Sequence, residues 1–134
     1  MFFNISNHPS KNWDKKQIDE AIAIDSFVME GEWSKGQITD IPFPNIPPRA
    51  STEEVIKITS EVVQQVKDKR FSDSFILDSA MVMGEFSACF YIIRELMNIG
   101  INVFVATTER VVTEKDGVKT TVFNFVQFRE IKNC

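Results

Sequence analysis

Three residues of this 134-residue chain carry side chains that could move a proton or bind an anion, although they lie far apart in the sequence. His8, the only histidine, follows the apolar run Phe2–Ser6, and Ser10 comes two residues later. Arg110 follows a second apolar run, Asn102–Ala106. An imidazole can move a proton, a hydroxyl can donate a hydrogen bond, and a guanidinium can clamp a phosphate with two hydrogen bonds. We therefore predict that any catalysis would depend on positioning and charge stabilisation by His8, Ser10 and Arg110, together with Ser87.

Each of the three also has a structural alternative that the sequence leaves open. A lone histidine is more often a loop residue than a catalyst, although its place at a strand end makes the two roles about equal. Ser10 is as well suited to begin a turn before a helix as to contact a ligand. Arg110 could pair with Glu85 or Glu109 instead of a phosphate.

Further candidates for ligand binding follow the apolar runs in the same way. They are Asn7, Trp13, Gly84, Glu85, Ser87, Thr107 and Thr108. Glu85 would begin a helix, where a carboxylate is favourable but would repel a bound phosphate. Trp13 fits a core or lid position better than a stacking surface, and Ser87 could bond either a ligand or the helix backbone.

The sequence lacks the motifs of metal-dependent and nucleotide-cofactor enzymes. It has no HExxH and no cysteine pair at ligand spacing, and Gly84 stands alone rather than in a glycine-rich phosphate loop. It also lacks the GxSxG elbow of serine hydrolases. We therefore expect no metal and no cofactor, so any chemistry would depend on positioning and charge stabilisation.

Apolar runs and helix signals alternate along the chain, which predicts strands joined by helical crossovers. The expected strands are Phe2–Ser6, Gln37–Ile41, Ala80–Met83 and Asn102–Ala106. Three helices are expected: one capped by Asp14 with Gln17 three residues on, one from the capping box Ser51/Glu54 to about Lys69, and one over Glu85–Asn98. Because crossovers make the strands parallel, their carboxyl ends meet at the edge where open sheets bind ligands. We predict that the loops 7–13, 42–48, 84–87 and 107–110 converge there.

The remaining segments carry weaker signals. Residues 31–35 are predicted to be a surface excursion and residues 70–78 a less regular connection, while four prolines make 42–49 an extended loop. The last helix carries one apolar side, which we expect to place Cys89 on the packed face as an inert thiol. That side consists of Phe86, Cys89, Phe90, Ile93 and Met97.

Asp116-Gly117 between two strand-like runs predicts a tight hairpin near the end of the chain. With these two as turn residues, Thr113 lies opposite Thr120 and Glu109 opposite Asn124. The last strand, Val122–Phe128, would then be antiparallel. The predicted fold class is α/β, a Rossmann-like three-layer sandwich whose mostly parallel sheet ends in a C-terminal antiparallel β-hairpin.

Composition limits the classes of function. Residues 1–134 are expected to form a single domain, and 43% hydrophobic and 25% charged residues are typical of a globular protein. A net charge of −4 argues against a duplex-DNA binder. We expect no signal peptide and no membrane span. Cys89 and Cys134 are far apart, so a disulfide is not expected, which fits a reducing cytoplasmic location.

Four short motifs resemble a group of small bacterial Rossmann-like proteins. They are Ser6-Asn7-His8-Pro9, Asp40-Ile41-Pro42-Phe43-Pro44, Met83-Gly84-Glu85-Phe86 and Thr107-Thr108-Glu109-Arg110. That group is similar to the compact CRISPR-associated Rossmann-fold (CARF) proteins of antiviral defence, which include stand-alone ring nucleases. Residues 26–36 depart from the pattern and look like an insertion.

The resemblance implies a nucleotide-binding homodimer that holds a cyclic oligoadenylate across paired strand ends. It also implies a phosphodiesterase activity without metal, in which the ribose 2′-hydroxyl attacks the adjacent phosphodiester. His8 and Ser10 would then lie near the phosphate, and Arg110 would stabilise its charge. Two alternatives stay open: an enzyme acting on another small phosphorylated or nucleoside-like metabolite, and a non-catalytic dimeric interaction protein that uses its hairpin for sheet-edge pairing.

Overall fold

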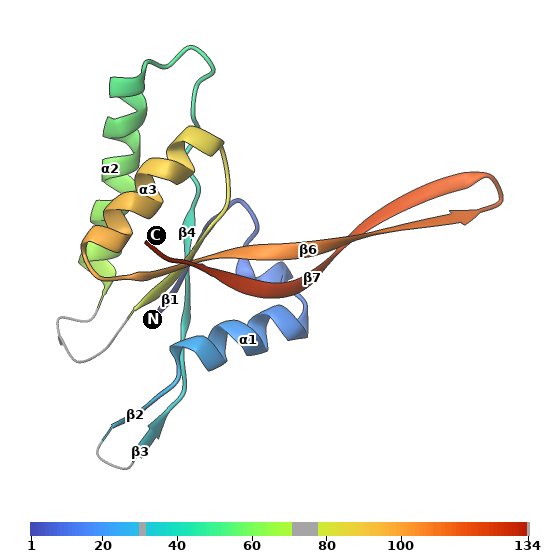
Figure 1. Ribbon diagram of the computed structural model, residues 1–134, viewed down its shortest axis with the longest axis horizontal. Helices are drawn as coiled ribbons and strands as arrows, with labels where there is room; N and C mark the ends of the chain where they lie inside the picture. The colour runs from blue at the N-terminus through green and yellow to red at the C-terminus, as the bar shows by residue number, and fades with distance from the viewer. Residues whose placement is uncertain (30–31, 71–77, 134) are drawn as a thin grey trace.

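The computed structural model describes residues 1–29, 32–70 and 78–133 (Figure 1). Its elements in chain order are β1 (Phe2–Ser6), a 3-10 turn (Ser10–Asn12), α1 (Lys15–Asp25), β2 (Phe27–Met29), β3 (Glu32–Ser34), β4 (Ile38–Pro42), α2 (Thr52–Lys69), β5 (Ser79–Val82), α3 (Phe86–Asn98), β6 (Asn102–Lys115) and β7 (Val118–Ile131). The predicted connection over 70–78 falls largely outside the described residues, as does Cys134. Within the described residues, none of the helices has the length and apolar character that crossing a bilayer would require.

The main sheet has the strand order β4-β1-β5-β6-β7. β1 pairs in parallel with both β4 and β5, and β5 pairs in parallel with β6, whereas β7 is antiparallel to β6. Figure 1 shows α2 and α3 together on one face of this sheet and α1 on the other. The predicted α/β sandwich, with a mostly parallel sheet and a C-terminal antiparallel hairpin, is confirmed.

Alternation along the strands divides the core between the two faces of the sheet. Phe3 and Ile5 of β1 belong to the apolar cluster under α2 and α3. Phe2 of β1 and Met81 of β5 belong to a second cluster, under α1. That second cluster also contains Trp13, Ala21, Phe125 and Phe128, and the ring centroids of Phe125 and Phe128 lie 4.8 Å apart. Burial on both faces explains why β1 is apolar without a break at its start.

Two of the expected helix starts are confirmed by their capping bonds. Asp14 precedes α1, and its carboxylate accepts a hydrogen bond from the Gln17 amide at 2.8 Å. At the start of α2, Ser51 Oγ accepts a hydrogen bond from the Glu54 amide and donates one to Glu54 Oε1, both at 3.2 Å, so the predicted pair of residues caps the helix. Side-chain acceptors at these positions satisfy backbone amides that have no partner inside the helix.

The predicted packed side of α3 is only partly right, because Cys89, Ile93 and Met97 are half-buried and pack against the core whereas Phe86 and Phe90 do not. The buried residues are Ala88, Ile92 and Leu96, whereas Phe86 and Phe90 are 91% and 59% exposed. Both stripes are apolar at helical spacing, so the period alone does not distinguish them. Contacts of α3 with α2 and with β5 and β6 select the first stripe. Cys89 lies at its border, and burial raises the pKa of its thiol.

β6 is one continuous strand, which corrects the expected division into a strand, a loop and a hairpin arm. Thr107–Arg110 lie inside β6 rather than in a loop, and the ladder shifts register between Thr107 and Thr108. β7 is correspondingly longer than the predicted Val122–Phe128. The two strands extend well beyond the rest of the sheet as a twisted arm (Figure 1).

The turn of this arm and the register that follows from it are as predicted. Asp116 and Gly117 have φ values of 53° and 77°, the left-handed conformation that a two-residue hairpin turn of this kind requires. The ladder places Thr113 opposite Thr120 and Glu109 opposite Asn124. A local turn signal therefore predicted pairings along the whole outer part of the arm.

The region after α1 contains an element that was not predicted. β2 and β3 form a small antiparallel pair, separate from the main sheet, where a surface excursion over 31–35 was expected. Residues 30 and 31 lie outside the described part of the chain. β4 then begins one residue later than predicted and ends at Pro42, at the edge of the sheet, where a proline is tolerated.

Candidate functional site

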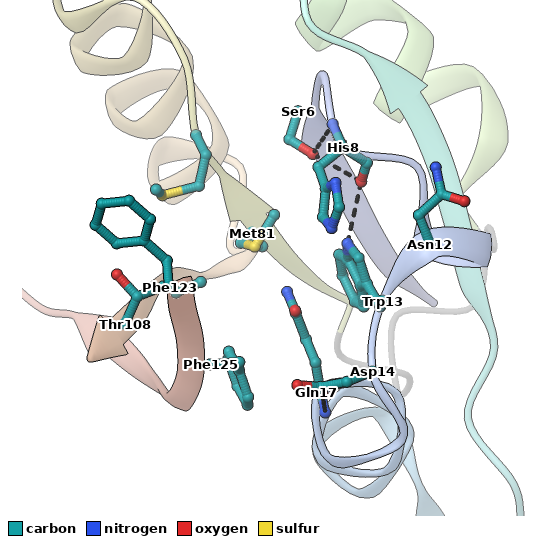
Figure 2. Close-up of a pocket in the computed structure, with 12 residues that line it drawn as sticks. Ser6, His8, Asn12, Trp13, Asp14, Gln17, Met81, Thr108, Phe123 and Phe125 are labelled. Atoms are coloured by element: carbon teal, nitrogen blue, oxygen red, sulfur yellow. Dashed lines mark hydrogen bonds between the residues drawn. The ribbon is translucent and has the colours of Figure 1, made fainter. Parts of the chain in front are cut away.

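A pocket of about 480 Å³ opens where β1, β5 and β6 end or leave the parallel part of the sheet, on the face covered by α1 (Figure 2). The lining residues come from β1, β5, both strands of the hairpin, and the segment from the end of β1 into α1. They are Ser6, His8, Asn12, Trp13, Asp14, Gln17, Met81, Met83, Ala106, Thr108, Phe123 and Phe125. The pocket therefore occupies the edge at which parallel sheets bind ligands.

The backbone of His8 is held by hydrogen bonds from buried side chains. Its carbonyl accepts bonds from Asn4 Nδ2 at 2.9 Å, Trp13 Nε1 at 3.0 Å and Ser6 Oγ at 3.3 Å. Its amide donates to Ser6 Oγ at 3.1 Å (Figure 2). Asn4 and Ser6 are buried in β1, where polar groups need such partners. The loop is thus fixed by its backbone, and the exposed imidazole is available to a ligand.

Ser10 faces a different partner from the one expected. Its hydroxyl donates to Asp40 Oδ2 at 3.0 Å, and its amide donates to Asp40 Oδ1 at 3.2 Å. Asn4 Nδ2 donates to the same Oδ1 at 2.8 Å, which joins Ser10 to the network that holds His8. Ser10 begins the 3-10 turn and does not line the pocket, so the structure places it in the turn-forming role that the sequence left open.

Arg110 is on the arm rather than in the pocket. It lies opposite Phe123 on the exposed part of β6, two residues after Thr108, and does not line the pocket. Alternation places its side chain on the same face of the strand as Thr108. The expected group of three is therefore not gathered in one cavity, because only His8 reaches it.

Glu85 and Ser87 are joined to each other at the start of α3. The Glu85 carboxylate accepts bonds from the Ser87 and Ala88 amides at 3.1 and 2.9 Å and from the Ser87 hydroxyl at 2.7 Å. The hydroxyl bond, followed by the bonds from the Ala88 and Ser87 amides, holds the pKa of Glu85 below its usual value. The structure thus shows a helix cap, and neither side chain lines the pocket.

Of the other predicted ligand-binding residues, two line the pocket and three do not. Trp13 and Thr108 line the pocket, whereas Asn7 is exposed outside it. Thr107 spans the register shift, where its hydroxyl donates to the Gln127 carbonyl at 3.1 Å and accepts from the Gln127 amide at 3.2 Å. A Cβ on Gly84 would lie 2.5 Å from the Phe43 ring, so this glycine permits a close approach between two loops.

Sequence reasoning missed much of the pocket wall. Gln17 was noted only as a capping partner, and Asn12, Met81, Phe123 and Phe125 were not considered for the site. The polar Asn4 and Ser6 inside an apolar strand were a usable signal, since buried polar residues need specific partners. The alternation of Phe123 and Phe125 was another signal, because it indicates one apolar face of a strand.

The pocket combines an apolar surface with polar groups at its rim. Met81, Trp13 and Phe125 belong to the cluster under α1 and provide flat or polarizable contacts, while His8, Asn12 and Thr108 provide hydrogen-bonding groups. Such a combination suits a planar aromatic ring attached to a polar group. Within the described residues, no three His, Cys, Asp or Glu side chains are grouped closely enough to hold a metal ion.

Comparison with known proteins places the chain in a protein family. The model of the family described as Uncharacterized protein MJ1673 matches residues 1–129, which is nearly the whole chain. No curated protein and no solved structure matches the chain significantly.

Proposed function

The chain belongs to the Uncharacterized protein MJ1673 family, and from the pocket at its sheet edge we propose that it binds and cleaves a cyclic oligoadenylate. The observation that carries the proposal is the pocket itself, which joins an apolar, aromatic surface to the only histidine of the chain. The aromatic surface suits an adenine ring, and the imidazole suits the phosphodiester next to it. The motif resemblance to CARF proteins supports the choice of a cyclic ligand.

The proposed reaction needs only groups that the ligand and His8 supply. His8 accepts the proton of a ribose 2′-hydroxyl, whose oxygen then forms a bond to the adjacent phosphorus. The bond from phosphorus to the 5′-oxygen breaks, and that oxygen receives the proton that His8 had accepted, which returns His8 to its starting state. The products are a 2′,3′-cyclic phosphate and a free 5′-hydroxyl, so the ring is opened without water being consumed. The fixed backbone of His8 keeps the imidazole in place for this transfer.

Ser10 and Arg110 have indirect roles in this proposal. Ser10 stabilises the His8 loop through Asp40 rather than touching the phosphate. Arg110, exposed on the arm next to the pocket wall, attracts the anionic ligand. This charge is useful because Asp14 adds a negative charge to the lining.

A homodimer is the oligomer that we propose for the working protein. Large apolar side chains are exposed on the arm and on α3, which is typical of a surface that another chain covers. They include Phe86, Phe90, Val112, Val118, Val122 and Phe123. The same exposed arm favours a second candidate function, a non-catalytic interaction protein, for which the pocket would be incidental.

The test is incubation with cyclic oligoadenylates of several ring sizes and their linear counterparts, in the presence of EDTA. We expect a linear product ending in a 2′,3′-cyclic phosphate, identified by chromatography and mass spectrometry. Light scattering on the same sample reports the oligomeric state. Failure of every ring size to bind would overturn the proposal and leave the interaction protein as the better explanation.

His8→Ala is expected to abolish turnover and to leave binding and the melting temperature nearly unchanged. The exposed imidazole makes no hydrogen bond within the described residues, and surface substitutions of this kind change stability by no more than about 0.5 kcal/mol. Turnover is followed by chromatography, and unfolding by circular dichroism. The matched control is Asn7→Ala, one residue earlier in the loop, exposed and outside the pocket lining. Equal turnover in the two variants would remove His8 from the mechanism.

A further inference from the structure

Gln17 is a buried polar residue whose side chain makes no hydrogen bond to any other described residue. Only 8% of its surface is exposed, yet it lines the pocket. Figure 2 shows its side chain extending from α1 into the cavity, with the amide group at its tip. The backbone amide of Gln17 donates a hydrogen bond to the Asp14 carboxylate. Within the described residues, the Gln17 side chain makes no hydrogen bond.

The surroundings of this amide are largely apolar. Trp13, Met81 and Phe125 line the same pocket and belong to the cluster under α1. The amide atoms of Gln17 are not among the fully buried side-chain atoms that lack a partner, so they reach the open pocket. In that position the amide can hydrogen-bond a ligand that enters the pocket.

We propose that the Gln17 side chain recognises the adenine base of the ligand, which rests on the proposed function and specifies what the pocket binds. An amide offers a carbonyl acceptor beside an N–H donor. Adenine offers the complementary pair, an exocyclic amine beside a ring nitrogen, and glutamine is a common partner of this edge. Oε1 accepts from the adenine amine, and Nε2 donates to the ring nitrogen.

The position of Gln17 in the helix suits this role. It lies in the first turn of α1, and the 2.8 Å bond from its backbone amide to Asp14 holds that turn in place. The aromatic and sulfur groups that surround the amide then contact the faces of the base while Gln17 contacts its edge. His8 lines the same pocket, so the sugar and phosphate extend toward the imidazole.

The experiment compares adenosine 5′-monophosphate with purine riboside 5′-monophosphate, which lacks only the exocyclic amine. In the wild-type protein, removal of the amine is expected to weaken binding about tenfold by calorimetry, because Oε1 loses its partner. In Gln17→Met the two nucleotides should bind equally. The melting temperature of this variant should stay close to that of the wild type, because methionine has a similar length and the capping bond to Asp14 is made by the backbone.

Gln65→Met is the matched control, because Gln65 is exposed on α2 and outside the pocket. This variant should keep the tenfold preference.

The role of Gln17 is overturned if the wild-type protein binds the two nucleotides equally or binds neither. It is also overturned if the preference survives in Gln17→Met. Binding of cyclic oligoadenylate with no Gln17-dependent preference would overturn this inference alone. A Gln17-dependent preference without binding of any cyclic ligand would overturn the proposed function alone.

Discussion

At the scale of single residues, Glu85 shows how one carboxylate can satisfy the start of a helix. Its bonds with Ser87 and Ala88 lower its pKa in the folded protein, the Ser87 hydroxyl having the largest effect. A carboxylate with a lowered folded pKa stabilises the protein above its unfolded pKa. That contribution is lost as the pH falls through the folded pKa.

Glu85→Ala should therefore lower the melting temperature at neutral pH. The difference in melting temperature between wild type and Glu85→Ala should stay constant as the pH falls to 4.5, the usual pKa of a glutamate side chain. It should decrease as the pH falls further. Thermal unfolding followed at a series of pH values measures it. Ser87→Ala, which removes the largest cause of the shift, should reduce the pH-dependent part. A difference between wild type and Glu85→Ala that is the same at neutral and acid pH would contradict this account.

Asn4 and Ser6 are polar residues inside a strand that form hydrogen bonds with each other and with the loop that follows. Both are buried, and Ser6 Oγ donates to Asn4 Oδ1 at 2.6 Å. The amide of Asn4 connects the His8 carbonyl with the Asp40 carboxylate. Two polar residues in an otherwise apolar strand thus hold the loop that carries the proposed catalytic histidine.

At the scale of elements, the turn between β5 and α3 lies directly against the loop that follows β4. Gly84 makes this possible, because a Cβ there would be 2.5 Å from the ring of Phe43. Phe43 is itself buried and packs in the cluster under α2 and α3. The contact brings together two of the loops that were predicted to converge at the ligand edge.

Gly84→Ala should reduce the free energy of unfolding by about 1–3 kcal/mol, the usual effect of overpacking. In a Phe43→Leu background the same substitution should have a smaller effect, since the shorter side chain leaves room for the methyl group. Urea denaturation of the four proteins gives the coupling, which we expect to exceed about 0.5 kcal/mol. Equal effects of Gly84→Ala in both backgrounds would show that the two loops are not in contact.

At the scale of the whole molecule, charged groups gather at the end of the sheet opposite the pocket. Asp78 is 0% exposed, and its carboxylate lies 3.0 Å from the amino group of Met1 and 3.4 Å from Arg70 Nε. The Met1 amino group is also 2.7 Å from Asp25, at the end of α1. These contacts join β1, α1, the end of α2 and the start of β5.

Asp78→Ala should lower the free energy of unfolding by about 1.5–3 kcal/mol, because it removes the buried carboxylate that the partly exposed Met1 amino group and Arg70 side chain contact. Urea denaturation near neutral pH measures the loss. Asp19→Ala is the matched control, since it removes a carboxylate from the exposed Lys15–Asp19 pair. The control should change the free energy of unfolding much less, because water and salt screen an exposed pair. Similar losses of unfolding free energy in the two variants would mean that burial of the Asp78 carboxylate does not increase its contribution to stability.

The order of the elements and several of their ends could be predicted because the signals are local. The limits of β1, the Ser51/Glu54 cap of α2 and the Asp116-Gly117 turn each depend on residues within a few positions of one another. The hairpin register follows from its turn by counting. For the same reason the sheet edge that holds the pocket could be named before any side chain was placed.

The membership of the pocket could not be predicted in this way. Thr107 and Thr108 are equivalent in sequence, but the register shift between them leaves Thr107 bonded to Gln127 and Thr108 facing the pocket. The buried stripe of α3 was similarly decided by its contacts with α2 and the sheet.

The sequence by itself determined the α/β architecture and the position of His8 at a strand end, since apolar runs, caps and turn residues act over short distances. Tertiary structure decided that Gln17 faces the pocket with His8 and that Ser10 and Arg110 do not line it. The direction of a side chain depends on neighbours that come from distant parts of the chain, and short-range patterns carry no information about them.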